Sequence, residues 1–119
     1  MYTIAHERDL RTGSSRTATF EGRDHGSEIS FFHVDSEPGQ GPDLHTHPYS
    51  ETFIVLSGEA VITVDDAEVG ARPGDVVVAA AGTPHRFRNS GSGRLEIMCI
   101  HASPRFESEW LDAADQPID

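Results

Sequence analysis

The sequence predicts a small all-β domain, an antiparallel sandwich or closed barrel, and three observations lead to that prediction. Short runs of β-branched, aromatic and other apolar residues follow one another from residue 29 to residue 101. Turn-forming Gly, Pro, Asp and Asn residues separate these runs at regular intervals. The chain has 119 residues, which suits one compact domain. Many short strands with regular turns are typical of a sandwich or barrel rather than of a parallel α/β sheet.

The expected elements follow in chain order. Residues 1–28 are polar and interrupted by glycines, so we expect an N-terminal arm with a short edge strand at 17–20. Residues 29–102 are the predicted barrel core, with strands at 29–34, 44–47, 52–56, 60–64, 67–69, 75–79, 85–89 and 94–101. Residues 103–119 are the expected tail of the same domain. We predict a short helix at 107–114, from which Trp110 and Leu111 pack on the barrel.

Composition and charge exclude several classes of protein. The formal net charge is −11, and all nine cationic side chains are arginines. Such a charge repels nucleic acids and anionic membrane surfaces. The N-terminus lacks the apolar segment of a signal peptide, and no apolar run has transmembrane length, so we expect a soluble cytoplasmic protein. Cys99 is the single cysteine, which excludes an internal disulfide and predicts a buried thiol.

Three residues with metal-binding side chains lie close together in the sequence. His45 and His47 are two apart, so in an extended chain both imidazoles point to the same face. Glu51 shares its parity with Phe53 and Val55, so it faces inward if they do. Imidazole and carboxylate together suit a divalent transition metal better than magnesium or calcium. His85 begins another strand and is a candidate fourth ligand, although its spacing alone does not place it beside His45.

The chain resembles the cupin family through two motifs. The first pairs a His-x-His with a glutamate between two glycines, and this sequence has Gly39, His45, His47, Glu51 and Gly58 at those spacings. The second is carried by Gly74, Gly82, His85 and Asn89. One position departs from the pattern, since Ala80 stands where the family usually has proline. That position shapes a turn and binds no metal, so the resemblance still implies a jelly-roll barrel, or double-stranded β-helix.

The resemblance implies a metal site made of His45, His47, Glu51 and His85. We expect one divalent Fe, Mn, Ni, Co or Zn ion per chain, with about two coordination positions left open. The leading functional hypothesis is a dioxygenase-like oxidoreductase acting on a small organic molecule, in which Glu51 releases the metal and acts as a base. Isomerase, cyclase or lyase chemistry at the same site is the alternative. A third class, a cupin module that holds a ligand or metal without turnover, also stays open, so whether the protein is an enzyme is undecided.

Other residues are weaker candidates for the site. His101 shares its parity with Leu95, Ile97 and Cys99, so it faces the cavity if Glu96 faces solvent, and there it would serve as an acid–base group. The candidate pocket walls, for which core packing is the default interpretation, are Phe32, Phe53, Phe87 and Met98. The resemblance and the short chain also predict a homodimer that pairs through the outer face of one sheet.

Overall fold

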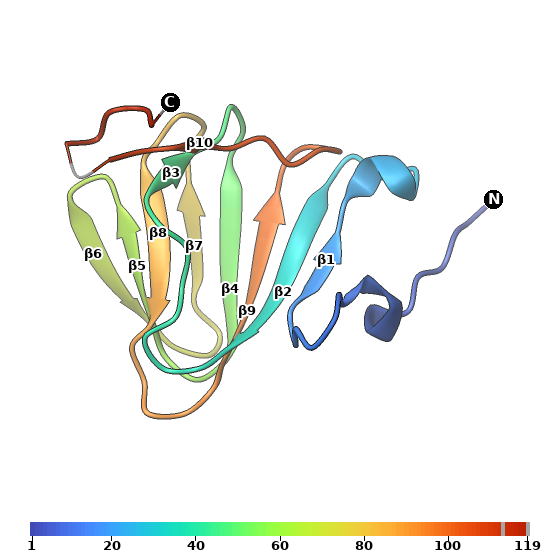
Figure 1. Cartoon of the computed structure of the whole chain (residues 1–119), viewed down its shortest axis with the longest axis horizontal. Coiled ribbons are helices and arrows are strands. Elements are labelled where there is room, and N and C mark those ends of the chain that lie inside the picture. The colour runs from blue at the N-terminus through green and yellow to red at the C-terminus, as the bar shows by residue number, and fades with distance from the viewer. Residues whose placement is uncertain (113, 119) are drawn as a thin grey trace.

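The computed structural model describes residues 1–112 and 114–118, and within them two five-stranded antiparallel sheets pack face to face (Figure 1). The first sheet has the order β1-β2-β9-β4-β7, with bounds Ala18–Phe20, Ser30–Ser36, Leu95–His101, Glu51–Ser57 and Val76–Ala79. The second has the order β10-β3-β8-β5-β6, with bounds Glu109–Trp110, His45–Thr46, His85–Asn89, Ala60–Val64 and Ala67–Ala71. Every strand expected between residues 17 and 101 is present, with ends displaced by a few residues at most.

The expectation of a closed barrel is wrong, because within the described residues the two sheets form a sandwich without hydrogen-bonded closure. The chain crosses between the sheets through irregular segments that contain Pro42, Pro48 and Pro84. Proline has no N–H to donate to a ladder, so these crossings do not continue either sheet. The jelly-roll character remains, since consecutive strands such as β4 and β5 lie in opposite sheets.

The predicted C-terminal helix is also wrong. Residues 109–110 form β10, which pairs with β3 through Glu109 opposite Thr46 and Trp110 opposite His45. The N–H of Leu111 then donates to Leu44 O at 3.0 Å. An eight-residue helix is marginal in water, whereas the free edge of β3 offers unpaired backbone groups, so edge pairing prevails. Ala113, inside the expected helix, lies outside the described residues.

The N-terminal segment contains two short 3-10 helices that the sequence pattern did not predict. They span Glu7–Leu10 (η1) and Gly22–Asp24 (η2). Gly22 has a packing reason, because an added Cβ would lie 2.1 Å from the carbonyl oxygen of Ile29. None of the helices in the described ranges has the length and apolar character needed to span a bilayer.

The core lies between the sheets, where alternation along β4, β8 and β9 selects the inward side chains. Along β9, Leu95, Ile97, Cys99 and His101 are buried, while the residues between them are half-exposed. The apolar part of this interior contains Phe53, Val55, Ala60, Ile62, Ala71, Ala79, Phe87, Leu95, Ile97 and Cys99. The buried histidines and Glu51 lie toward the end where β3 lies, and that end carries the site.

Candidate metal centre

The structure brings the four predicted ligands together at one end of the interior. His45 and His85 are Cα partners across β3 and β8, and His47 follows β3 directly. Glu51 begins β4 in the opposite sheet and reaches across to them. Their ligand atoms all lie within 4.8 Å of one another, and all four residues are buried. The register of β3 on β8 therefore supplies the link that sequence spacing did not.

Backbone carbonyl groups orient each imidazole of the cluster. The Nδ1 atoms lie 2.7 Å from Asp43 O for His45, 2.8 Å from Glu107 O for His47 and 2.8 Å from Thr83 O for His85. A carbonyl oxygen only accepts, so each Nδ1 carries the proton. In the neutral ring the Nε2 lone pair is then free, and partners of this kind are what hold metal-binding histidines in place.

The Glu51 carboxylate sits between these rings. Its Oε1 lies 2.8 Å from His47 Nε2 and 2.9 Å from His85 Nε2. Burial raises the pKa of Glu51, but its contacts with His101, His47 and His85 outweigh burial and lower the pKa below its ordinary value. Glu51 is therefore an anion near neutral pH, although it is only 3% exposed. A buried anion requires compensating positive charge.

This geometry fits a cation better than extra protons. In neutral rings with the proton on Nδ1, the Nε2 atoms of His47 and His85 are hydrogen-bond acceptors, and so is Glu51 Oε1, which they face. Either a proton or a metal ion must therefore lie between these atoms. Burial, together with the neighbouring imidazoles of His85 and His47, lowers the pKa of His45 to about 4, which disfavours a full set of imidazolium rings. Bonds of about 2.0–2.2 Å place opposite ligands about 4.4 Å apart, which is compatible with the observed cluster. The residues present could hold a divalent transition metal ion.

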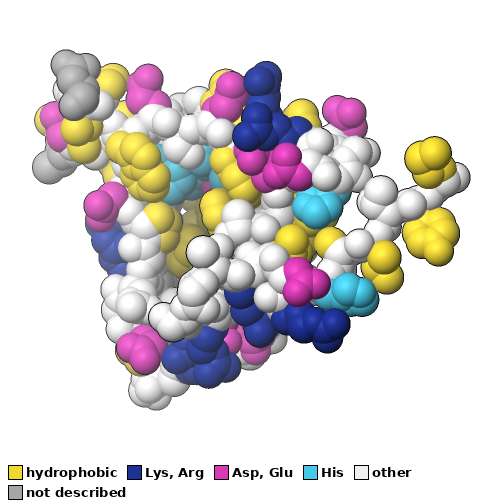
Figure 2. Space-filling model, turned by 45° about the vertical axis from the view of Figure 1, so that its right-hand side comes forward, with side chains coloured by type: hydrophobic (Ala, Val, Ile, Leu, Met, Phe, Trp, Pro, Cys, Tyr) yellow, Lys and Arg dark blue, Asp and Glu magenta, His cyan; other side chains and the backbone are white. Residues whose placement is uncertain are grey.

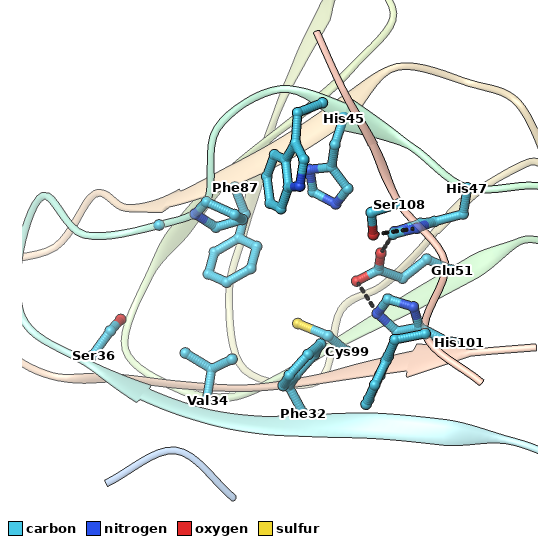
Figure 3. Close-up of a pocket in the computed structure, with 14 residues that line it drawn as sticks. Phe32, Val34, Ser36, His45, His47, Glu51, Phe87, Cys99, His101 and Ser108 are labelled. Carbon is cyan, nitrogen blue, oxygen red and sulfur yellow. Dashed lines mark hydrogen bonds and ion pairs between the residues drawn. The ribbon is translucent and has the colours of Figure 1, made fainter. Parts of the chain in front are cut away.

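His101 also faces the cluster, as its parity predicted. Its Nε2 lies 3.5 Å from Glu51 Oε2 (Figure 3). Its Nδ1 lies 2.7 Å from the hydroxyl of Tyr49. Burial raises the pKa of Tyr49, so the phenol keeps its proton, and its oxygen also accepts the N–H of Glu107 at 3.1 Å. With Tyr49 donating to Nδ1, the His101 proton lies on Nε2 and points to Glu51. His101 is therefore held where it can exchange a proton with a molecule beside the cluster.

A pocket of about 320 Å³ opens beside the cluster, between the two sheets. Figure 2 shows the hollow, with histidine side chains visible among hydrophobic ones. Its walls are mostly apolar and aromatic, and none of the described lining residues is a lysine or arginine. The residues that line it are Phe32, Val34, Ser36, Gly41, Pro42, His45, His47, Glu51, Phe87, Cys99, His101, Phe106, Ser108 and Trp110. Burial raises the pKa of Cys99 well above its ordinary value, so Cys99 is the buried, protonated thiol that was expected.

The expected pocket walls divide into three groups. Phe32 and Phe87 line the pocket, while Phe53 packs in the apolar core. Met98 is on the opposite side of β9 from Cys99, so the expectation that it contributes to the interior is wrong. The parity of β9, with Glu96 on the outer side, could have identified this.

Sequence reasoning missed four residues of the site. Phe106, Ser108 and Trp110 come from the C-terminal segment, which crosses the end of the molecule where β3 lies (Figure 1). Ser108 Oγ lies 3.1 Å from His47 Nδ1, so this segment contacts a predicted ligand directly. No local signal indicates such contacts, because they join residues about 60 positions apart. The sequence placed Tyr49 only in the bend after Pro48. Tyr49 is, however, two residues from both His47 and Glu51, and this spacing could have indicated that all three side chains point to the same side.

Comparisons with known proteins agree with this geometry. Residues 32–101 match the sequence profile of the family described as Cupin domain, and the chain belongs to that family. Tetracenomycin polyketide synthase protein TcmJ from Streptomyces glaucescens is 27% identical over 111 residues, which cover 90% of this chain and 74% of that protein. An oxalate-binding protein from Thermotoga maritima is 29% identical over 77 residues, which are 64% of each protein. The crystal structure of a cupin 2 domain-containing protein from Halorhodospira halophila has a TM-score of 0.74 and 27% identity, and covers 85% of this chain and 72% of that chain.

Proposed function

We propose that this cupin is a metal-dependent enzyme that oxidises a small, largely apolar organic molecule with dioxygen. One observation carries the proposal: the pocket leads directly to the four-residue cluster and holds an acid–base side chain, His101, beside it. A purely structural sandwich would fill this interior with apolar side chains. A module that only holds a ligand needs no acid–base group at hydrogen-bonding reach of the site.

The chain's own residues have distinct roles in this proposal. His45, His47, Glu51 and His85 would hold the ion. When bound, a divalent transition ion supplies Lewis acidity and about two open coordination positions. His101, with its proton on Nε2, would donate that hydrogen to a substrate oxygen beside the cluster, and Tyr49 keeps the ring oriented. The apolar walls exclude water and strengthen these interactions.

The side chains that line the pocket limit the chemical class of substrate that can bind. Aromatic side chains such as Phe32, Phe87, Phe106 and Trp110 favour a flat, apolar body. None of the described lining residues is an arginine or lysine, so the pocket wall offers no cationic side chain to pair with a carboxylate group of a substrate. An oxygen-bearing group, such as an enol or phenol, is therefore the expected point of attachment at the cluster.

The test uses protein reconstituted with iron(II) and offered a panel of catechols, naphthols and 1,3-diketones under ¹⁸O-labelled dioxygen. The expected result is oxygen uptake with both oxygen atoms recovered in the organic products by mass spectrometry. His47→Ala is expected to abolish uptake, whereas His25→Ala, outside the site and stacked on Phe20, serves as the matched control. Metal and ligand binding without any product would overturn the proposal and favour a binding module.

Cyclase, isomerase or lyase chemistry is the second candidate, and the likeness to TcmJ favours it. That relative is described as a polyketide synthase protein, and polyketides rearrange by proton transfer next to carbonyl groups. The pair of His101 and Glu51 could perform such transfers without an oxidant. Product formation from a 1,3-diketone at an unchanged rate under argon would select this candidate over the dioxygenase.

We also propose that a second copy of this chain covers the outer face of the first sheet. Val76 and Val78 are each 58% exposed there, and Leu56 is 48% exposed on the neighbouring strand. A flat apolar sheet face is self-complementary across a twofold axis. Sedimentation velocity at micromolar concentration should show a dimer that Val78→Asp converts to monomer, and a monomeric wild-type protein would contradict this.

A further inference from the structure

The pocket ends, away from the metal ligands, at a serine whose hydroxyl has no partner. Ser36 is the last residue of β2, is 7% exposed, and lines the pocket together with Val34 and Phe87. Among the described residues, its Oγ is the one buried side-chain nitrogen or oxygen without a hydrogen bond. Figure 3 shows Ser36 at the opposite end of the pocket from His47, Glu51 and His101, on the same wall as Val34.

The polar groups around Ser36 are already engaged with one another. Asn89 Nδ2 donates to Ser36 O at 3.2 Å and to Gly93 O at 2.9 Å, while Asn89 Oδ1 accepts the N–H of Gly91 at 3.0 Å. Both N–H groups of the Asn89 side chain are therefore used, and none of these bonds involves the Ser36 hydroxyl. A buried hydroxyl without a partner is costly, and such groups in native proteins require an explanation.

Ser30, on the same strand, is a buried serine whose hydroxyl is hydrogen-bonded within the protein, and it offers a comparison for Ser36. Ser30 is fully buried, donates to Ser103 O at 2.8 Å and accepts the N–H of Gly22 at 3.0 Å. Both functions of that hydroxyl are used within the protein. Ser36 differs because its buried hydroxyl has no partner in the protein while the residue lines the pocket, so a molecule seated against this wall is its available partner.

The loop opposite Ser36 fixes this end of the pocket. Gly41 packs against β8 so closely that a Cβ would lie 1.9 Å from Phe87 O, and Arg88 Nη1 donates to Pro42 O at 2.9 Å. The Ser36 carbonyl accepts a hydrogen bond from Asn89, which is the last residue of β8. His85 is the first residue of the same strand. The four residue steps from His85 to Asn89 span about 13 Å between Cα atoms, which leaves room for a two-ring molecule that contacts the cluster at one end and Ser36 at the other.

We propose that Ser36 is a second polar subsite, which hydrogen-bonds a hydroxyl or carbonyl oxygen at the far end of the ligand. The ligand is then a neutral, flat aromatic molecule with one oxygen directed to the metal ligands and another directed to Ser36. The proposal deepens the proposed function, on which it rests for the identity of the pocket, but it concerns binding and does not depend on which reaction follows.

Two simple probes test this subsite: 2-naphthol, with one hydroxyl, and 2,6-dihydroxynaphthalene, with hydroxyls at opposite ends. Calorimetric titrations use both the Zn²⁺-loaded and the metal-free protein, since zinc supports no oxidation. The diol should bind wild-type protein about fivefold more tightly than 2-naphthol. Ser36→Ala should reduce that ratio to the small statistical advantage of two equivalent hydroxyls and leave the affinity for 2-naphthol unchanged. Ser36→Thr, which retains a hydroxyl, should preserve the ratio.

Controls make each outcome decisive. Ser30→Ala should leave the diol-to-naphthol ratio at its wild-type value. An equal ratio in wild type and Ser36→Ala overturns the proposal, as does failure of both probes to bind. A loss of thermal stability in Ser36→Ala as large as in Ser30→Ala also overturns it, because the hydroxyl would then be bonded within the protein. Failure of oxygen uptake with a retained Ser36 effect would count against the proposed function alone.

Discussion

The two ends of the interior are built from the same strands yet differ in chemistry. At the end near β3, β4 contributes Glu51 and β9 contributes His101, whereas toward the other end they contribute Val55 and Leu95. Alternation buries each of these residues regardless of polarity. The difference lies in what surrounds them: backbone carbonyl groups of irregular segments hold the imidazoles, whereas Val55 and Leu95 pack among the apolar core residues. The metal-binding end depends on hydrogen bonds to its side chains, and the core around Val55 and Leu95 depends on packing.

Removing a ligand should separate the two ends most clearly. We expect His47→Ala to lower the metal content, measured by elemental analysis after purification without added metal, from about one ion per chain to near zero. The fold should persist, because the apolar end is untouched. His25→Ala is the control that should retain the metal. Equal metal content in wild type and His47→Ala would show that the ion binds elsewhere.

A substitution in the apolar core should lower stability without affecting metal binding. Leu95 is fully buried among the core residues, so Leu95→Ala should lower the free energy of unfolding by about 2–5 kcal/mol. Val78→Ala, on the exposed outer face, should change it by less than about 0.5 kcal/mol in a monomeric preparation. Urea denaturation measures both. Folded Leu95→Ala should still bind one equivalent of metal, and a loss of metal there would contradict the independence of the two ends.

A smaller effect is expected at the buried hydroxyl of Ser30. Ser30→Ala leaves the buried N–H of Gly22 without its acceptor, which should cost about 1–3 kcal/mol of unfolding free energy. Ser36→Ala should be close to neutral, because no hydrogen bond is lost. Comparing the urea midpoints of the two variants measures the difference, and equal destabilisation would contradict it.

The smallest effect concerns the outer face, at Asp35. Burial raises its pKa, but hydrogen bonds from Arg94 and Arg16 outweigh burial and lower the pKa below the ordinary value. A lowered folded-state pKa stabilises the fold above the unfolded pKa, about 3.9, and this contribution disappears as pH falls through the folded-state value. Because Arg16 is 63% exposed, the contribution should stay below about 1 kcal/mol. Asp35→Asn should therefore destabilise the protein at pH 7, and its stability should converge with that of wild type as the pH falls below the lowered pKa of Asp35; thermal denaturation at each pH measures this.

Local patterns explain how much of the site was predictable. His45, His47 and Glu51 were placed inward by parity, and His101 by its parity with Cys99, because a period of two is a property of each strand alone. His85 required the family resemblance, since its contact with His45 depends on which strands become neighbours. The expected helix failed for the same reason: β10 exists because β3 has a free edge, and that edge is about 60 residues away in sequence.

The sequence by itself determined the strands between residues 17 and 101, the turns between them, the inward faces of the site-bearing strands and the identities of the metal-binding side chains. Only the tertiary structure decided that the C-terminal segment supports His47, that Tyr49 orients His101, and that Ser36 is left without a partner. The physical reason is that side-chain direction along a strand is set by neighbouring residues. Whether a buried polar group finds a hydrogen-bond partner depends instead on which distant backbone segments lie beside it in the fold. The spacing of residues in the sequence does not indicate these long-range contacts.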